Sequence, residues 1–119
     1  MTREFIILPS FQVKWNELGF NDEDMIRLET ELINNPKIGP VIRKTGGVRK
    51  MRFAFENRGK SGSVRIIYVD FELYEKLYFI DVFQKSCKEN LTNEERNNMS
   101  KIVNLIELSL KEEKNERNV

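Results

Sequence analysis

Two strand-like runs on either side of a glycine-rich turn constrain the fold of this chain more than any other part of its sequence. Over residues 48–56, apolar and polar side chains alternate, as in a strand that buries one face. Residues 64–71 are rich in β-branched and aromatic side chains and apolar on both faces, as in a central strand. Residues 57–62 between them favour a turn. The two runs therefore predict a β-hairpin within a larger sheet.

Patterns on the N-terminal side of the hairpin predict one strand and two helices. An apolar run at residues 3–8 predicts a short strand that Pro9 closes. The spacing of apolar side chains predicts a helix over residues 11–18, with Ser10 as its N-cap. Asn21 and the acidic residues after it predict the start of a second helix.

Patterns on the C-terminal side complete a single α+β domain over residues 1–119. Residues 77–83 predict another strand, and the capping box at residues 92–95 opens a final helix, with a charged C-terminal tail from about Lys111. The order is β-α-α-β-β-β-α. We expect a small, mostly antiparallel sheet with helices on one face. Whether the final helix covers the other face or packs at an edge is left open by the sequence.

Composition excludes several classes of function. The chain has no histidine and a single cysteine, Cys87, so it lacks the commonest acid–base group and cannot form an internal disulfide. It shows no metal-ligand spacing and no phosphate-binding loop that opens a helix, so we expect no metal and no cofactor. The apolar run at residues 5–8 is too short for a signal peptide or a membrane span. These features predict a cytoplasmic protein that does not contact membranes.

Positive charge is concentrated in the hairpin. Residues 43–65 contain eight cations and one anion, a net charge of +7, so the rest of the chain carries −6 against a total of +1. A local positive potential of this kind attracts polyanions. The alternative is a solvated hairpin whose arginines lie flat over apolar neighbours.

Arginine and lysine can support phosphate chemistry without imidazole or metal. Arginine binds a phosphate through parallel hydrogen bonds and stabilises charge that develops on its oxygens. Lysine transfers protons when burial or neighbouring cations lower its pKa. RNA supplies its own nucleophile, the ribose 2′-hydroxyl. A metal-free ribonuclease is therefore chemically possible with these residues, although they do not require it.

Several segments together resemble the HigB branch of the RelE/ParE toxin superfamily. They are residues 34–37 (NNPK), 46–52 (GGVRKMR), 59–68 (GKSGSVRIIY) and 83–92 (FQKSCKENLT). The likeness implies a RelE-like α+β fold and a toxin of a type II toxin–antitoxin system. It further implies a metal-independent endoribonuclease that enters the ribosome and cuts messenger RNA by 2′-hydroxyl attack, which inhibits translation. The implied partner is a helix-turn-helix, HigA-like antitoxin, through which alone the toxin reaches operator DNA.

The resemblance also implies roles for individual side chains. Arg65 matches an arginine that stabilises the transition state, and Lys50 and Lys60 match phosphate binders or acid–base groups. Lys85 matches a lysine that protonates the leaving 5′-oxygen or holds a flanking phosphate. Many relatives carry a tyrosine where this chain has Phe83, so a hydroxyl is missing at that position. Further contacts to RNA phosphates are expected from Arg49, Arg52 and Arg58.

Two other functions remain open at this point. A ParE-like toxin would act on DNA gyrase, but the basic hairpin that this chain keeps argues against that branch. A catalytically inactive toxin would only bind the antitoxin and co-repress the operon. The absence of histidine, and Phe83 in the place of a tyrosine, allow this alternative. Three aromatic side chains, Trp15, Tyr68 and Tyr78, are expected to pack in the core and not to act in catalysis.

Overall fold

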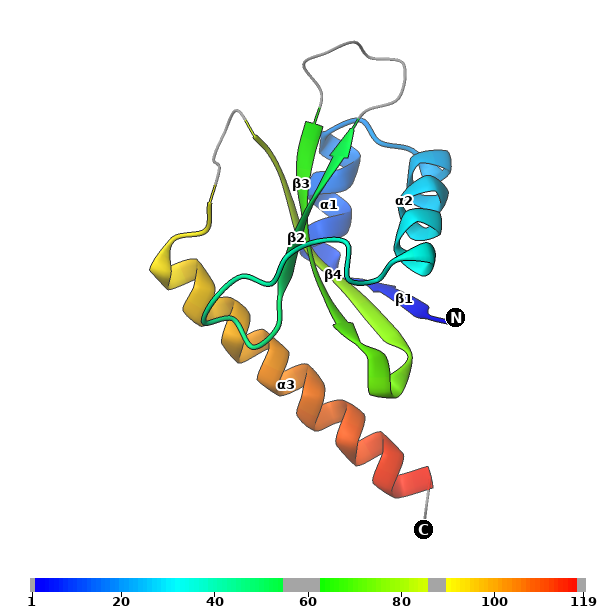
Figure 1. Cartoon of the computed structure of the whole chain (residues 1–119), viewed down its shortest axis with the longest axis vertical. Helices are drawn as coiled ribbons and strands as arrows, with labels where there is room; N and C mark the ends of the chain where they lie inside the picture. Colours follow the sequence, from blue (N-terminus) through cyan, green and yellow to red (C-terminus); the bar gives the residue numbers. More distant parts are fainter. Residues whose placement is uncertain (1, 55–62, 86–89, 118–119) are drawn as a thin grey trace.

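The computed structural model describes residues 2–54, 63–85 and 90–117 (Figure 1). Its elements follow the predicted order and confirm the α+β class. They are β1 (Glu4–Ile7), α1 (Pro9–Glu17), α2 (Asp22–Asn34), β2 (Arg49–Ala54), β3 (Ser63–Phe71), a 3₁₀ turn (Glu72–Tyr74), β4 (Lys76–Gln84) and α3 (Asn93–Arg117). The predicted turn at residues 57–62 lies outside the described residues.

The four strands form one sheet in the order β1-β4-β3-β2. The pairs β2–β3 and β3–β4 are antiparallel, while β1 runs parallel to β4, so the sheet is mostly antiparallel as expected. β3 lies in the centre of the antiparallel part, which agrees with its apolar side chains on both faces. β2 is an edge strand, and the segment before it covers part of that edge through an Ile42 N–H hydrogen bond to Val48 O.

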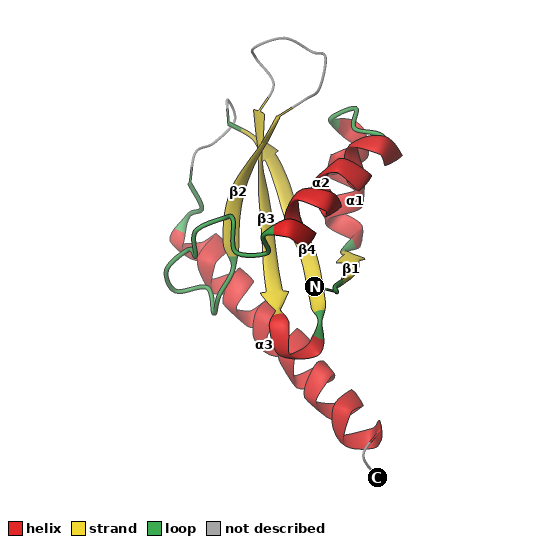
Figure 2. Cartoon of the chain, turned by 45° about the vertical axis from the view of Figure 1, so that its right-hand side comes forward, coloured by secondary structure: helices red, strands yellow, loops and turns green. Residues whose placement is uncertain are grey.

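The first two helices cover one face of the sheet (Figure 2). β2 and β3 contribute every second side chain to this core, among them Met51 and Phe53. Trp15 of α1 stacks on Phe20 at a centroid distance of 4.1 Å, which confirms Trp15 as a core residue. Leu28 and Leu32 bring the apolar side of α2 to the same core. This is the arrangement that the sequence predicts for the first two helices.

The third helix lies on the opposite face, a choice that the sequence leaves open. Met99 and Val103 of α3 are buried against Ile67 and Val69, which point away from the first core. The expectation of helices on one face is therefore corrected for α3. Since β3 is apolar on both faces, leaving its second face bare would expose that surface to water.

The start of α3 matches its prediction, whereas the start of α1 does not. Glu95 N–H donates to Thr92 Oγ1 at 3.1 Å and Thr92 N–H donates to Glu95 Oε1 at 2.9 Å, so the capping box is present. α1 begins at Pro9 and its N-cap, Leu8, has no side-chain hydrogen bond, so Ser10 is not a cap. Proline is favourable at the first helical position, because its fixed φ suits the helix and it has no N–H to leave unpaired.

The charged stretch from Lys111 onward continues α3 as far as Arg117. In Figure 1 the C-terminal half of this helix projects beyond the sheet. Leu105 and Leu108 are exposed on it, while Leu110 is buried.

Candidate nucleic-acid interface

The second face of the sheet changes character at the level of Ile67. On one side of this residue the face is apolar and packs against α3. On the other side, the register places Arg52 opposite Arg65, and Arg65 opposite Phe83, in one row across three strands. Lys50 lies on this face as well, because it is two residues from Arg52. Of the described helices, α1 and α2 pack on the other face, and α3 packs on this face against Ile67 and Val69.

Arg52 and Arg65 form an arginine pair across β2 and β3. Lys50 N–H donates outward to Pro40 O at 3.1 Å, so Lys50 and Ile67 do not exchange ladder hydrogen bonds. Bonded and non-bonded pairs alternate along an antiparallel ladder, so Arg52 and Arg65 also form a non-hydrogen-bonded pair. Side chains are closer in such pairs, and like charges directly opposite destabilise a sheet. The sheet therefore brings the side chains of two arginines close together on one face.

The two arginines differ in exposure. Arg65 is 2% exposed, whereas Arg52 is exposed. Among residues 2–54, 63–85 and 90–117, no hydrogen bond or ion pair reaches the Arg52 guanidinium. Beside the pair, Lys50 Nζ donates to Asn90 Oδ1 at 3.0 Å. This hydrogen bond directs the lysine ammonium toward the segment that precedes α3.

The structure does not bring Arg49 to this surface. Its register partner is Tyr68, so it lies on the face of α1 and α2. Its Nη1 donates to Gly39 O at 2.7 Å and to Lys37 O at 3.4 Å. Arg49 therefore holds the loop that precedes β2.

Two other predicted site residues, Arg58 and Lys60, lie outside the described residues. Lys85 follows Gln84, whose register partner is Val64, so Lys85 lies at the same end of the sheet as Arg65 and is exposed. The structure thus gathers Lys50, Arg52 and Arg65 on one face, with Lys85 at its border.

Residues 36–40, which we call the 36–40 loop, form a wall beside these cations. The Tyr68 hydroxyl donates to Pro36 O at 2.8 Å and accepts from Gly39 N at 3.1 Å. A Cβ on Gly39 would lie 2.7 Å from Lys50 O, so the loop touches the backbone of β2. Burial raises the pKa of Tyr68, which keeps the hydroxyl protonated and able to donate. Tyr68 is a core residue, as predicted.

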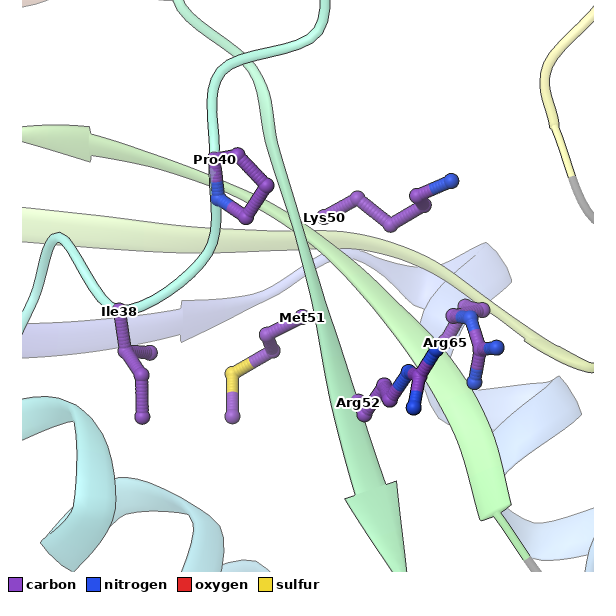
Figure 3. A pocket seen from close by; sticks show the side chains of 6 residues that line it. All are labelled: Ile38, Pro40, Lys50, Met51, Arg52 and Arg65. Carbon is purple, nitrogen blue, oxygen red and sulfur yellow. The ribbon is translucent and has the colours of Figure 1, made fainter.

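A cavity of about 430 Å³ opens between the loop and the cations. Figure 3 shows its six lining side chains, which are Ile38, Pro40, Lys50, Met51, Arg52 and Arg65. Both faces of β2 contribute, so the cavity follows the outer edge of that strand.

The described residues contain no group of three or more histidine, cysteine or acidic side chains that could hold a metal ion. In the same part of the chain, none of the helices combines the length and the hydrophobicity of a membrane-spanning segment. The six lining residues of the cavity offer cationic and apolar side chains.

Residues 20–117 match the model of a protein family described as the RelE toxin of the RelE/RelB toxin–antitoxin system. The chain belongs to the RelE toxin family. A structure of the Escherichia coli toxin RelE, an arginine double mutant in the free state, has the same fold with a TM-score of 0.53. The two chains are 15% identical, and the match covers 75% of this chain and 90% of that one.

As a RelE-family toxin, this protein has an antitoxin as its expected partner. The arginine pair lies on the fold that the family shares, at the end of the sheet where α3 does not reach. Sequence reasoning named both arginines and Lys50 but missed Ile38, Pro40 and Asn90. Nothing in the local sequence connects residues 36–40 to β2.

Proposed function

We infer that this protein is a ribosome-dependent endoribonuclease that inhibits translation by cutting messenger RNA. The observation that carries this function is the arginine pair, because two guanidinium groups directly across a sheet fit one phosphodiester group. Family membership supports the same reading, since it makes the chain a toxin with an antitoxin partner.

In the proposed reaction the ribose 2′-hydroxyl attacks the neighbouring phosphorus. The P–O2′ bond forms and the P–O5′ bond breaks, which leaves a 2′,3′-cyclic phosphate and a 5′-hydroxyl. One proton leaves the 2′-oxygen and one reaches the 5′-oxygen, so the step needs no oxidant, metal or cofactor. Charge grows on the equatorial phosphate oxygens during the attack, and fixed cations lower the energy of that state.

Burial fits Arg65 for transition-state stabilisation. Its guanidinium is held in the sheet with little freedom, so little reorganisation is needed when charge develops. Arg52 is exposed beside it and would hold the incoming phosphate. Lys50, whose ammonium donates a hydrogen bond to Asn90, would bind a second phosphate oxygen or transfer a proton. Lys60 and Lys85 remain candidates for the proton that the 5′-oxygen receives.

A helix-turn-helix, HigA-like antitoxin is the proposed partner in the cytoplasm. It would block the cationic face and carry the toxin to operator DNA. A ParE-like attack on gyrase is not favoured, because Lys50, Arg52 and Arg65 are gathered on one face instead of being lost.

A translation extract programmed with a reporter messenger tests the proposal. The wild-type protein should yield cut messenger, and Arg65→Ala and Arg52→Ala should each reduce cleavage by about 100-fold or more, as loss of a transition-state donor does. Lys111→Ala removes one exposed cation on α3 and should change nothing.

Arg52→Ala keeps the test decisive if the buried Arg65 proves necessary for folding. Translation arrest without any cut messenger from the wild-type protein would contradict the proposal. A DNA-damage response in cells in place of translation arrest would favour the gyrase branch.

A further inference from the structure

The cavity at the edge of β2 has one cationic side and one apolar side. Arg52, Arg65 and Lys50 supply the charges, while Ile38, Pro40 and Met51 supply the apolar surface. In Figure 3 the two loop residues lie on one side of β2 and Arg65 lies on the other. Phosphate chemistry uses the cations and leaves the apolar side without a role.

A ribonucleotide has parts that fit both sides. Its phosphate is anionic, and its base is a flat ring with apolar faces joined to that phosphate through one ribose. Single-stranded RNA is commonly recognised by bases that leave the stack and lie on side chains of the protein. A phosphate on the arginine pair therefore places an adjoining base against the 36–40 loop.

The edge of β2 adds main-chain hydrogen-bonding groups to that apolar side. Lys50 N–H points outward to Pro40 O, and Ala54 O accepts from Arg27 Nη2 at 2.8 Å. Outward and inward residues alternate along an edge, so Arg52, between them, also turns its N–H and C=O outward. The edges of nucleobases carry hydrogen-bond donors and acceptors, which can pair with the main-chain N–H and C=O of Arg52.

The 36–40 loop is fixed in place, as a selective surface must be. Tyr68 binds it from inside the core through Pro36 O and Gly39 N, at 2.8 and 3.1 Å. Arg49 binds it from the side through Gly39 O at 2.7 Å. Ile38, which projects from this anchored loop, is still 42% exposed and lines the cavity.

We propose that the 36–40 loop is the base-selecting wall of the site, with Ile38 and Pro40 in contact with the nucleobase beside the cut phosphate. Tyr68 and Arg49 are positioning residues for this wall. The inference rests on the proposed ribonuclease function and adds to it the part of the substrate that sets cut-site preference.

The base-selecting role of the 36–40 loop can be tested by mapping the ends of the cut messenger in the translation extract. Ile38→Ala should change the relative use of different cut sites by about threefold or more, a modest factor because a half-exposed contact discriminates less than an enclosed pocket. Tyr68→Phe removes only the hydroxyl that anchors the loop and should shift the preference in the same direction. Val41→Ala is the matched control, since Val41 is exposed on the same segment and does not line the cavity.

The outcomes separate this inference from the proposed function. An unchanged cut profile in Ile38→Ala, or the same change in Val41→Ala, would contradict the base-selecting role of the 36–40 loop. Neither result would contradict the proposed ribonuclease function. A uniform loss of cleavage at all sites in Ile38→Ala would also overturn it, because the loop would then serve catalysis or folding and not selection. If the wild-type protein cuts no messenger, both proposals fall together.

Discussion

Arg3 and Asp70 form a buried, bidentate ion pair that connects the residue before β1 to the end of β3. Arg3 Nε lies 2.7 Å from Asp70 Oδ1, Arg3 Nη2 lies 3.2 Å from Asp70 Oδ2, and both side chains are 4% exposed. The hydrogen bond to Asp70 raises the pKa of Arg3 further above its already high value. The arginine therefore stays charged at every ordinary pH.

Removing one member of this pair leaves the other charge buried without its partner. Arg3→Ala should lower the free energy of unfolding by about 3 kcal/mol, measured by urea denaturation. Lys76→Ala is the control, because its ion pair with Glu4, also at 2.7 Å, includes a glutamate that is 64% exposed. Loss of that surface pair should cost about 1 kcal/mol or less. Equal losses in the two variants would contradict the account.

Gly39→Ala should lower the stability of the protein and alter its cut profile. The added Cβ would lie 2.7 Å from Lys50 O, which is backbone and cannot turn aside, so the loop must move away from β2. That movement strains the hydrogen bonds to Tyr68 and Arg49. We expect a loss of about 1–3 kcal/mol in thermal or urea unfolding, together with an altered cut profile. Wild-type stability in this variant would show that the loop does not press on the strand.

The third helix offers a matched pair of leucines two residues apart. Leu110 is 3% exposed and Leu108 is 57% exposed. Leu110→Ala should lower the free energy of unfolding by about 2–3 kcal/mol, because it leaves a cavity. Leu108→Ala should change it by less than about 0.5 kcal/mol. A reversed order would mean that α3 is rotated on the sheet.

Glu29 of α2 predicts a dependence of stability on pH. Burial raises its pKa, so the folded protein holds this proton more tightly than the unfolded chain does. Its ionised form therefore costs stability above the folded pKa, and this cost disappears as the pH falls below the ordinary glutamate value. Glu29→Gln should raise the melting temperature at pH 7 and have a smaller effect at pH 4. A larger gain at pH 4 would contradict the sign.

Alternation along β2 was enough to predict that Lys50 and Arg52 share a face, because side chains in a strand point to opposite faces in turn. The same rule places Arg49 on the other face, yet its sequence neighbours made it look like part of one basic cluster. The register with β3 decides which residue of that strand meets Arg52. A slip by one residue would have turned Arg65 toward α1 and α2.

The residues that surround the cations could not be predicted from the sequence. Asn90 meets Lys50 across 40 residues, and Gly39 meets Tyr68 across 29, so neither contact has a local signal. The loop before β2 could be recognised as a loop, but its docking depends on a buried tyrosine in another strand.

Periods of two and 3.6 residues, together with composition, were enough to predict the strands, the helices, their order and the excess of positive charge. Only the folded chain shows the register of β2 on β3, the face that α3 covers and the position of the 36–40 loop. Those features depend on packing between residues far apart in the chain, where the burial of whole surfaces outweighs local preference.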